Sequence, residues 1–141
     1  MAGWKLSVRV DARDSLGRYL GHIHQAAVRT VEETARASAA YAQSIDPVKT
    51  GALRASTQPV ILGGLTGGVV WGTNHWEYQD RGTMPHHIKG DVSFFWAREG
   101  RRWTPGHNTI SHPGNPALHF TSRTQDFASK MFMAAARANF A

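Results

Sequence analysis

Apolar residues recur at helical spacing through the first third of the chain. From Asp14 or Ser15, residue types that commonly cap helices, an apolar or small side chain returns every three or four positions as far as Ile45. These positions are Leu16, Leu20, Ile23, Ala27, Val31, Ala35, Ser38, Ala42 and Ile45. The pattern predicts one amphipathic helix of about 30 residues, which is about 45 Å long.

The second half of this predicted helix is rich in alanine. Small side chains at Ala35, Ser38, Ala39 and Ala42 would let another surface approach the helix closely. That surface would be either a sheet of the same domain or a neighbouring subunit. Packing inside the domain is the more common outcome for such a stripe.

The helical pattern stops in the stretch at residues 46–56, and a strand pattern follows it. Pro47 cannot continue a helix and pushes Asp46 toward extended backbone angles. Gly51 allows a tight turn, after which Leu53 can enter the core. This stretch is therefore predicted to redirect the chain from helix to sheet.

Alternation of apolar and polar residues predicts several strands. Residues 4–10, Trp-Lys-Leu-Ser-Val-Arg-Val, form a half-buried strand ahead of the helix by this criterion. Residues 57–62 and 69–73 are predicted to form a hairpin closed by the glycine-rich turn at 63–68. Residues 92–96 and 98–103 indicate a second hairpin with its turn near Glu99 and Gly100.

The rest of the chain is predicted to contain two helical segments and a loop. Residues 74–83 have the potential for a short helical turn that ends at Gly82, and residues 104–116 are predicted to form an extended surface loop. A closing helix is expected at 122–139. The side chains on one of its faces are Phe127, Met131, Ala134, Ala135 and Ala138.

Together these elements predict a single α+β domain over residues 1–141. A long N-terminal helix and a C-terminal helix would pack on an antiparallel sheet of about four to five strands. No apolar run is long enough to cross a bilayer, and the N-terminus has no signal-peptide core, so a soluble protein that is cytoplasmic when made is expected.

Charge and cysteine content narrow the choice of partner. The chain carries 16 Lys and Arg against 10 Asp and Glu, and its net charge of +6 favours a polyanion such as nucleic acid, or an acidic protein. Arg98, Arg101 and Arg102 are the only local cluster of basic residues. The absence of cysteine excludes disulfides, thiolate metal sites and a cysteine nucleophile.

Histidine is the one remaining hint of chemistry. Six of the 8 histidines fall in the second half of the chain: His75, His86, His87, His107, His112 and His119. No His-Glu-x-x-His pair is present, and adjacent histidines in an extended segment point in opposite directions, which disfavours a shared metal. No Gly-x-Ser-x-Gly sequence positions a serine nucleophile. We therefore predict no catalytic residue, no metal and no cofactor.

Three sequence blocks, in order, carry a resemblance to a known family. Residues 48–56 read Val-Lys-Thr-Gly-Ala-Leu-Arg-Ala-Ser, residues 76–83 read Trp-Glu-Tyr-Gln-Asp-Arg-Gly-Thr, and residues 112–120 read His-Pro-Gly-Asn-Pro-Ala-Leu-His-Phe. With the long helix ahead of them, these blocks resemble the neck and tail-completion (head–tail joining) proteins of long-tailed bacteriophages. The resemblance spans about residues 14–138. Trp76 stands where that family often has Tyr, and Asp80 where it usually has Glu.

The resemblance implies a structural virion protein of the head–tail junction, with no enzymatic activity and no cofactor. Copies of the chain would form an oligomeric ring, hexameric by the resemblance, in the neck, tail-completion or tail-terminator layer. Its partners would be other head–tail connector and tail proteins and, non-specifically, double-stranded DNA, with no membrane. The protein would be found in the virion, and in the host cytoplasm during assembly.

Specific residues can be assigned to these contacts. Arg98, Arg101 and Arg102 are candidates for lining the DNA channel through phosphates alone, although a solvated turn explains them equally well. The expected subunit interface takes its residues from the three blocks: Arg54, Trp76, Glu77, Tyr78, Asp80, Arg81, His112 and Pro113. Large aromatic rings supply much interface energy, and Arg54 or Arg81 would pair with Asp80 or Glu77 of a neighbour.

Two alternative functions are kept open. A small basic nucleic-acid-binding module would explain the charge, and Phe94, Phe95 and Trp96 would then stack on bases, although they are equally good core residues. A histidine-dependent metal hydrolase is the third hypothesis, which chelation of purified protein would test.

Overall fold

The computed structural model describes residues 12–63, 65–88, 94–96, 101–103 and 110–141. Its helices are α1 (Ala12–Ile45), α2 (Ala52–Ser56), α3 (Trp76–Arg81) and α4 (Phe120–Asn139). Its strands are β1 (Thr57–Gly63), β2 (Thr66–Trp71), β3 (His86–Ile88), β4 (Phe94–Trp96), β5 (Arg101–Trp103) and β6 (Ile110–His112). The strand predicted at residues 4–10 lies outside the described residues.

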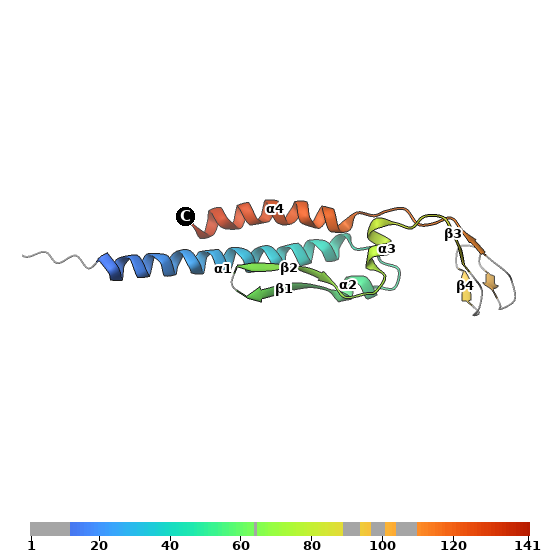
Figure 1. Ribbon diagram of the computed structural model, residues 1–141, viewed down its shortest axis with the longest axis horizontal. Coiled ribbons are helices and arrows are strands. Elements are labelled where there is room, and N and C mark those ends of the chain that lie inside the picture. The colour runs from blue at the N-terminus through green and yellow to red at the C-terminus, as the bar shows by residue number, and fades with distance from the viewer. Residues whose placement is uncertain (1–11, 64, 89–93, 97–100, 104–109) are drawn as a thin grey trace, which may run out of the picture.

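Helix α1 is the axis of an elongated body. It has 34 residues, which corresponds to about 51 Å. Helix α4 runs antiparallel along one side of α1, and the hairpin of β1 and β2 runs along another (Figure 1). The long helix predicted from the apolar pattern is confirmed, with its start at Ala12.

The small residues of α1 allow these neighbours to approach. Ala35 and Ala39 are each 3% exposed, Ser38 is 2% exposed and Ala42 is 0% exposed. Because α1 packs against both α4 and the hairpin, the stripe is buried by the chain itself. Packing inside the domain, the first of the two predicted outcomes, is therefore the correct one.

Aromatic rings pack between the two helices and at one end of the hairpin. Tyr41 of α1 and Phe127 of α4 are stacked with ring centroids 4.3 Å apart. Trp71 of β2 lies 5.7 Å from the ring of Phe120, which is 1% exposed. On the predicted face of α4, Ala135 is buried, and Phe127 and Met131 are half-buried. Ala134 and Ala138 on that face are exposed.

The strands form three antiparallel pairs: β1 with β2, β3 with β6, and β4 with β5. The α+β class is confirmed, but the described strands do not join into one sheet of four to five strands. After β2, the chain passes through α3 and leaves the body, so the later strands pair among themselves in an arm (Figure 1). The arm consists of the described parts of residues 82–119.

Both hairpins predicted from alternation are present. The strands of the first, β1 and β2, keep their register from Thr57 opposite Trp71 to Ile61 opposite Gly67. In the second hairpin, the main chain of β4 pairs with that of β5, and its turn residues lie outside the described residues. Strand β6 interrupts the loop predicted at 104–116, because its main chain pairs with β3. Residues 104–109 of that loop lie outside the described residues.

Candidate subunit interface at the root of the arm

The first of the three blocks closes the C-terminal end of α1. Gly51 takes a left-handed conformation with φ of 80°, and Leu53 is buried in the short helix that follows. Just before the block, the carboxylate of Asp46 is 3% exposed and accepts two hydrogen bonds. Thr57 Oγ1 donates to Oδ2 over 2.6 Å, and Trp71 Nε1 donates to Oδ1 over 3.1 Å. Asp46 thus ties the end of α1 to both strands of the hairpin.

The second block, helix α3, supplies the cap of α4. Asp80 is 6% exposed, and its Oδ1 accepts the backbone N–H of Thr121 over 2.9 Å, while Thr121 Oγ1 donates to Oδ2. The backbone oxygen of Asp80 accepts the N–H groups of Leu118 and His119 over 3.1 Å and 3.0 Å. His119 stands at the N-cap with φ of 52° and makes no side-chain cap. The N-terminus of α4 is therefore capped by the carboxylate of Asp80, which lies 41 positions before Thr121.

The second and third blocks cross where the arm leaves the body. The main chains of Thr83 and Asn115 exchange hydrogen bonds of 2.9 Å and 3.1 Å. This crossing requires glycine on both sides. A Cβ on Gly82 would lie 2.6 Å from the carbonyl oxygen of Asn115, and a Cβ on Gly114 would collide with the carbonyl oxygen of Thr83. Both glycines have positive φ, of 73° and 83°, so two independent constraints favour glycine there.

An open pocket of about 650 Å³ lies at this crossing. Tyr78 from α3 and His112 from β6 both line it, although they are 34 positions apart in the sequence. The ring of His112 lies 4.9 Å from that of His86, and its Nδ1 accepts the N–H of Gly114 over 3.0 Å. Tyr78 is 63% exposed and Met84, also in the lining, is 83% exposed. Rings and a thioether without a formal charge suit contact with another protein surface.

Other residues predicted for the interface fall in different places. Trp76 is half-buried and stacks on Trp71 with centroids 5.9 Å apart. The exposed side chains are those of Arg54 on α2, Glu77 and Arg81 on α3, and Pro113 after β6. None of these lines the pocket at the crossing. The Asp80 carboxylate is buried and bonded to Thr121, so it does not belong to the exposed surface at the arm root.

Sequence reasoning missed Met84 and Ile88 of this pocket. Residues 84–88 carry no strand pattern in the sequence, because their apolar members do not alternate regularly with polar ones. Exposure of a methionine next to a tyrosine can be recognised only once α3 and β3 are placed in space. These two residues can therefore be identified from the tertiary structure but not from the sequence.

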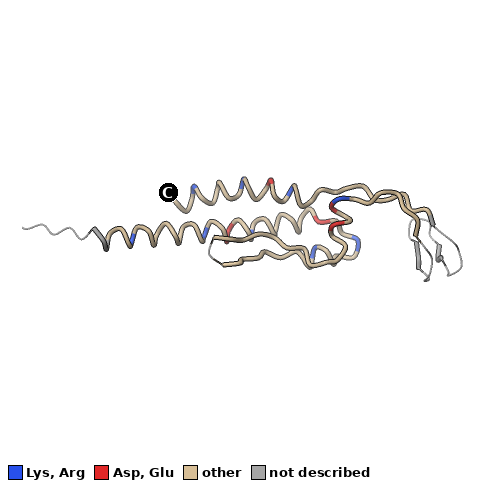
Figure 2. Tube along the Cα trace, in the orientation of Figure 1, with Lys and Arg blue, Asp and Glu red and all other residues tan. Residues whose placement is uncertain are grey.

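Two of the three predicted DNA-contacting arginines lie in strand β5 of the arm. Arg98 lies outside the described residues, and the main chains of Arg101 and Arg102 pair in β5 with Trp96 and Phe95. Along the four described helices, lysines and arginines are scattered without a dense cluster (Figure 2). The assignment of these three arginines to DNA stays a prediction.

Among the described residues, no three side chains of His, Asp or Glu come close enough together to hold a metal ion. None of the helices in that part of the chain has the combination of length and apolar character needed to cross a bilayer. Comparisons with protein-family models, curated proteins and solved structures gave no match to this chain.

Proposed function

We propose that this chain is a structural subunit of the head–tail junction of a long-tailed bacteriophage. Copies of it would form a ring around the DNA channel in the neck, tail-completion or tail-terminator layer. The observation that carries the proposal is that the three blocks behind the resemblance meet in space. Leu53 and Gln79 line one pocket, and Asp80 and Thr83 bond to residues of the third block.

The architecture supports a role in assembly. A ring subunit needs a stiff wall and a contact that reaches the next copy. Here the body is built on one long helix, and the arm extends well beyond it (Figure 1). The blocks lock the arm to the body through the Asp80 cap and the Gly82 and Gly114 crossing. The arm would therefore keep a fixed orientation relative to the body when it contacts the next copy.

The chemistry of the arm root supports a protein partner. Its open pocket presents Tyr78 and Met84, which are large, exposed and uncharged. Such side chains are frequent at the energetic centre of interfaces. We include Arg54, Glu77, Arg81 and Pro113 as the rim of the interface, since all four are exposed and belong to the three sequence blocks. The net charge of +6 would suit a ring that surrounds DNA without reading its sequence.

The test is a phage in which the gene for this chain is interrupted, grown with and without the intact gene supplied in trans. Without it, we expect electron micrographs of DNA-filled heads and separate tails. With it, we expect joined, infectious particles and a ring of this chain at the neck in an image reconstruction. Joined and infectious particles in the absence of the protein would contradict the proposal.

A matched pair of variants tests the arm root in the same assay. Met84→Asp places a charge in the pocket and should leave heads and tails separate. Met133→Asp makes the same change on α4, at a methionine that is 55% exposed, and should support joining. Equal titres for the two variants would count against the arm root as an interface.

A further inference from the structure

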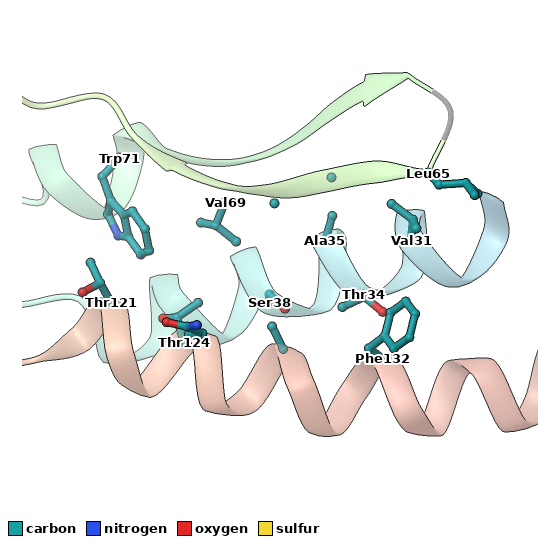
Figure 3. A pocket seen from close by; sticks show the side chains of 14 residues that line it. Val31, Thr34, Ala35, Ser38, Leu65, Val69, Trp71, Thr121, Thr124 and Phe132 are labelled. Atoms are coloured by element: carbon teal, nitrogen blue, oxygen red, sulfur yellow. The ribbon is translucent and has the colours of Figure 1, made fainter. Parts of the chain in front are cut away.

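A groove of about 430 Å³ runs along the body between β2 and α4, with α1 as its floor (Figure 3). No residue of β1 lines it, so the groove lies on the side of β2 away from β1. Its lining is mainly small or apolar. Its walls and floor include Val31 and Ala35 of α1, Val69 and Trp71 of β2, and Ala128 and Phe132 of α4.

Two features of the groove call for a polar partner as well as an apolar one. Ser38, on its floor, is 2% exposed, and its Oγ has no hydrogen-bond partner among the described residues. A buried hydroxyl without a partner is destabilising. Strand β2 also pairs on one edge only within the described part of the chain, which leaves the backbone groups of its other edge facing the groove. An added strand would pair its backbone groups with those of this edge.

The size of the groove suits a short strand. Strand β2 has 6 residues, which span about 20 Å. The chain contains a segment of matching length and pattern at residues 4–10. Trp4, Leu6, Val8 and Val10 would point to one face of a strand, and Lys5, Ser7 and Arg9 to the other. One face would fill an apolar groove, and the opposite face would stay in water.

This segment cannot lie in the groove of its own copy. Only Asp11 separates Val10 from the first residue of α1. The first groove residue on α1, Val31, is 19 positions along the helix from Ala12, or about 28 Å. The whole stretch from Trp4 to Ala12 spans about 27 Å when extended, so folding back would bring at most Trp4 to the near end of the groove.

We propose that residues 4–10 of one copy add as a third strand to β2 of a neighbouring copy. The apolar face of the donated strand fills the groove over α1 and α4, and its backbone pairs with the free edge of β2. The donor strand leads directly into Leu16, Tyr19 and Leu20, which are exposed, so the accepting copy also covers this part of α1. The contact is head-to-tail, which closes into a ring or extends as a filament. The inference deepens the proposed function and rests on its premise that copies of the chain associate.

The experiment uses the full chain and two variants that damage opposite partners of the contact. Val8→Asp puts a charge on the apolar face of the donor strand, and Ala128→Trp fills the groove from α4. We expect each to weaken self-association, measured by sedimentation velocity, by at least about a hundredfold relative to the unaltered chain. Circular dichroism checks that both variants fold.

Matched controls lie next to each substituted residue. Ser7→Asp makes the same charge change on the polar face of the donor strand, and Ala134→Trp adds the same ring at an exposed position of α4 outside the groove. Both controls should associate as the unaltered chain does. Mixing Val8→Asp with Ala128→Trp should give 1:1 heterodimers and nothing larger, because one intact strand then meets one intact groove.

Each remaining outcome overturns the inference. These are an unaltered chain that stays monomeric at the highest concentration reached, a Val8→Asp variant that associates normally, or a mixture that stays monomeric. The phage assay separates this failure from failure of the proposed function. Particles joined by a Val8→Asp protein would refute the donated strand alone, whereas particles joined without any protein would refute the role at the neck.

Discussion

The side chains at the two ends of the body differ in burial and in the partners they contact. At the junction end, where α1, α2 and α3 meet the start of α4, Asp46, Asp80, Leu53 and Phe120 are all buried with partners inside the chain. At the free end, residues 15–25 of α1 are all exposed. The same apolar period runs through both ends. The difference shows that the junction end holds the fold, and that the free end has its apolar stripe available for another surface.

The free end is exposed because none of the described elements covers it. Helix α4 ends at Asn139, and the residues that follow it share a small pocket with Tyr19, Ile23 and Ala26. Before that point, Leu16 and Leu20 are 58% and 55% exposed. A buried stripe of alanines and an exposed stripe of leucines thus occupy one helix. Substitutions at the two ends should therefore affect different properties.

The largest effect on stability is expected from Asp46→Ala at the junction end. The substitution leaves Trp71 Nε1 without its acceptor, and the Thr57 hydroxyl keeps only its second acceptor, the carbonyl oxygen of Leu53 at 3.0 Å. Two hydrogen bonds to a charged group are lost, so the free energy of unfolding should fall by about 3–5 kcal/mol. Urea titration followed by tryptophan fluorescence measures it.

Asp46→Asn is the matched control for this site. The amide keeps an acceptor for Trp71, and the Thr57 hydroxyl can rotate to accept from the amide nitrogen. We expect the asparagine variant to lose less than half as much unfolding free energy as the alanine variant. Equal losses would mean that the size of the side chain, and not its bonds, matters at this end.

The next largest effect is expected from Gly114→Ala at the root of the arm. The added Cβ would collide with the carbonyl oxygen of Thr83. The substitution would also place a residue other than glycine at φ of 83°, which is unfavourable. We expect a loss of about 2–4 kcal/mol, or local release of the arm. Gly51→Ala is the control, because Gly51 has φ of 80° but nothing within 4 Å of its added Cβ. Its cost should be only about 1 kcal/mol. Hydrogen exchange at Thr83 and Asn115 distinguishes a released arm from global destabilisation.

The contrast between the ends also explains what could be predicted from the sequence. Helices α1 and α4 were predicted because their apolar period is local. The first hairpin was predicted because its strands are close in sequence. Strand β6 was missed because its pairing with β3 joins segments more than 20 positions apart, and the prolines and glycines around it indicate only a loop.

Candidate interface residues were predictable only in part, for the same reason. Tyr78 and His112 were assigned to one surface from the sequence blocks, and they do line one pocket. Asp80 was assigned with them, but its carboxylate bonds to Thr121. A sequence block marks residues that matter without saying whether they hold the fold or face a partner. That distinction depends on burial, which arises when segments 41 positions apart meet.

The smallest effect on stability is expected at the free end, from Leu20→Gln. Leucine and glutamine have similar helix propensities, and Leu20 is 55% exposed, so the unfolding free energy of the monomer should change by less than about 0.5 kcal/mol. Self-association should nevertheless weaken about tenfold, because a leucine side chain covered by a neighbouring copy would be replaced by a polar one. Sedimentation velocity and urea titration at low protein concentration measure the two quantities separately.

Gln25→Ala, an exposed position on the opposite side of the helix, should change neither. If Leu20→Gln destabilises the monomer and leaves association intact, then the free end is part of the fold, and the contrast with the junction end does not hold.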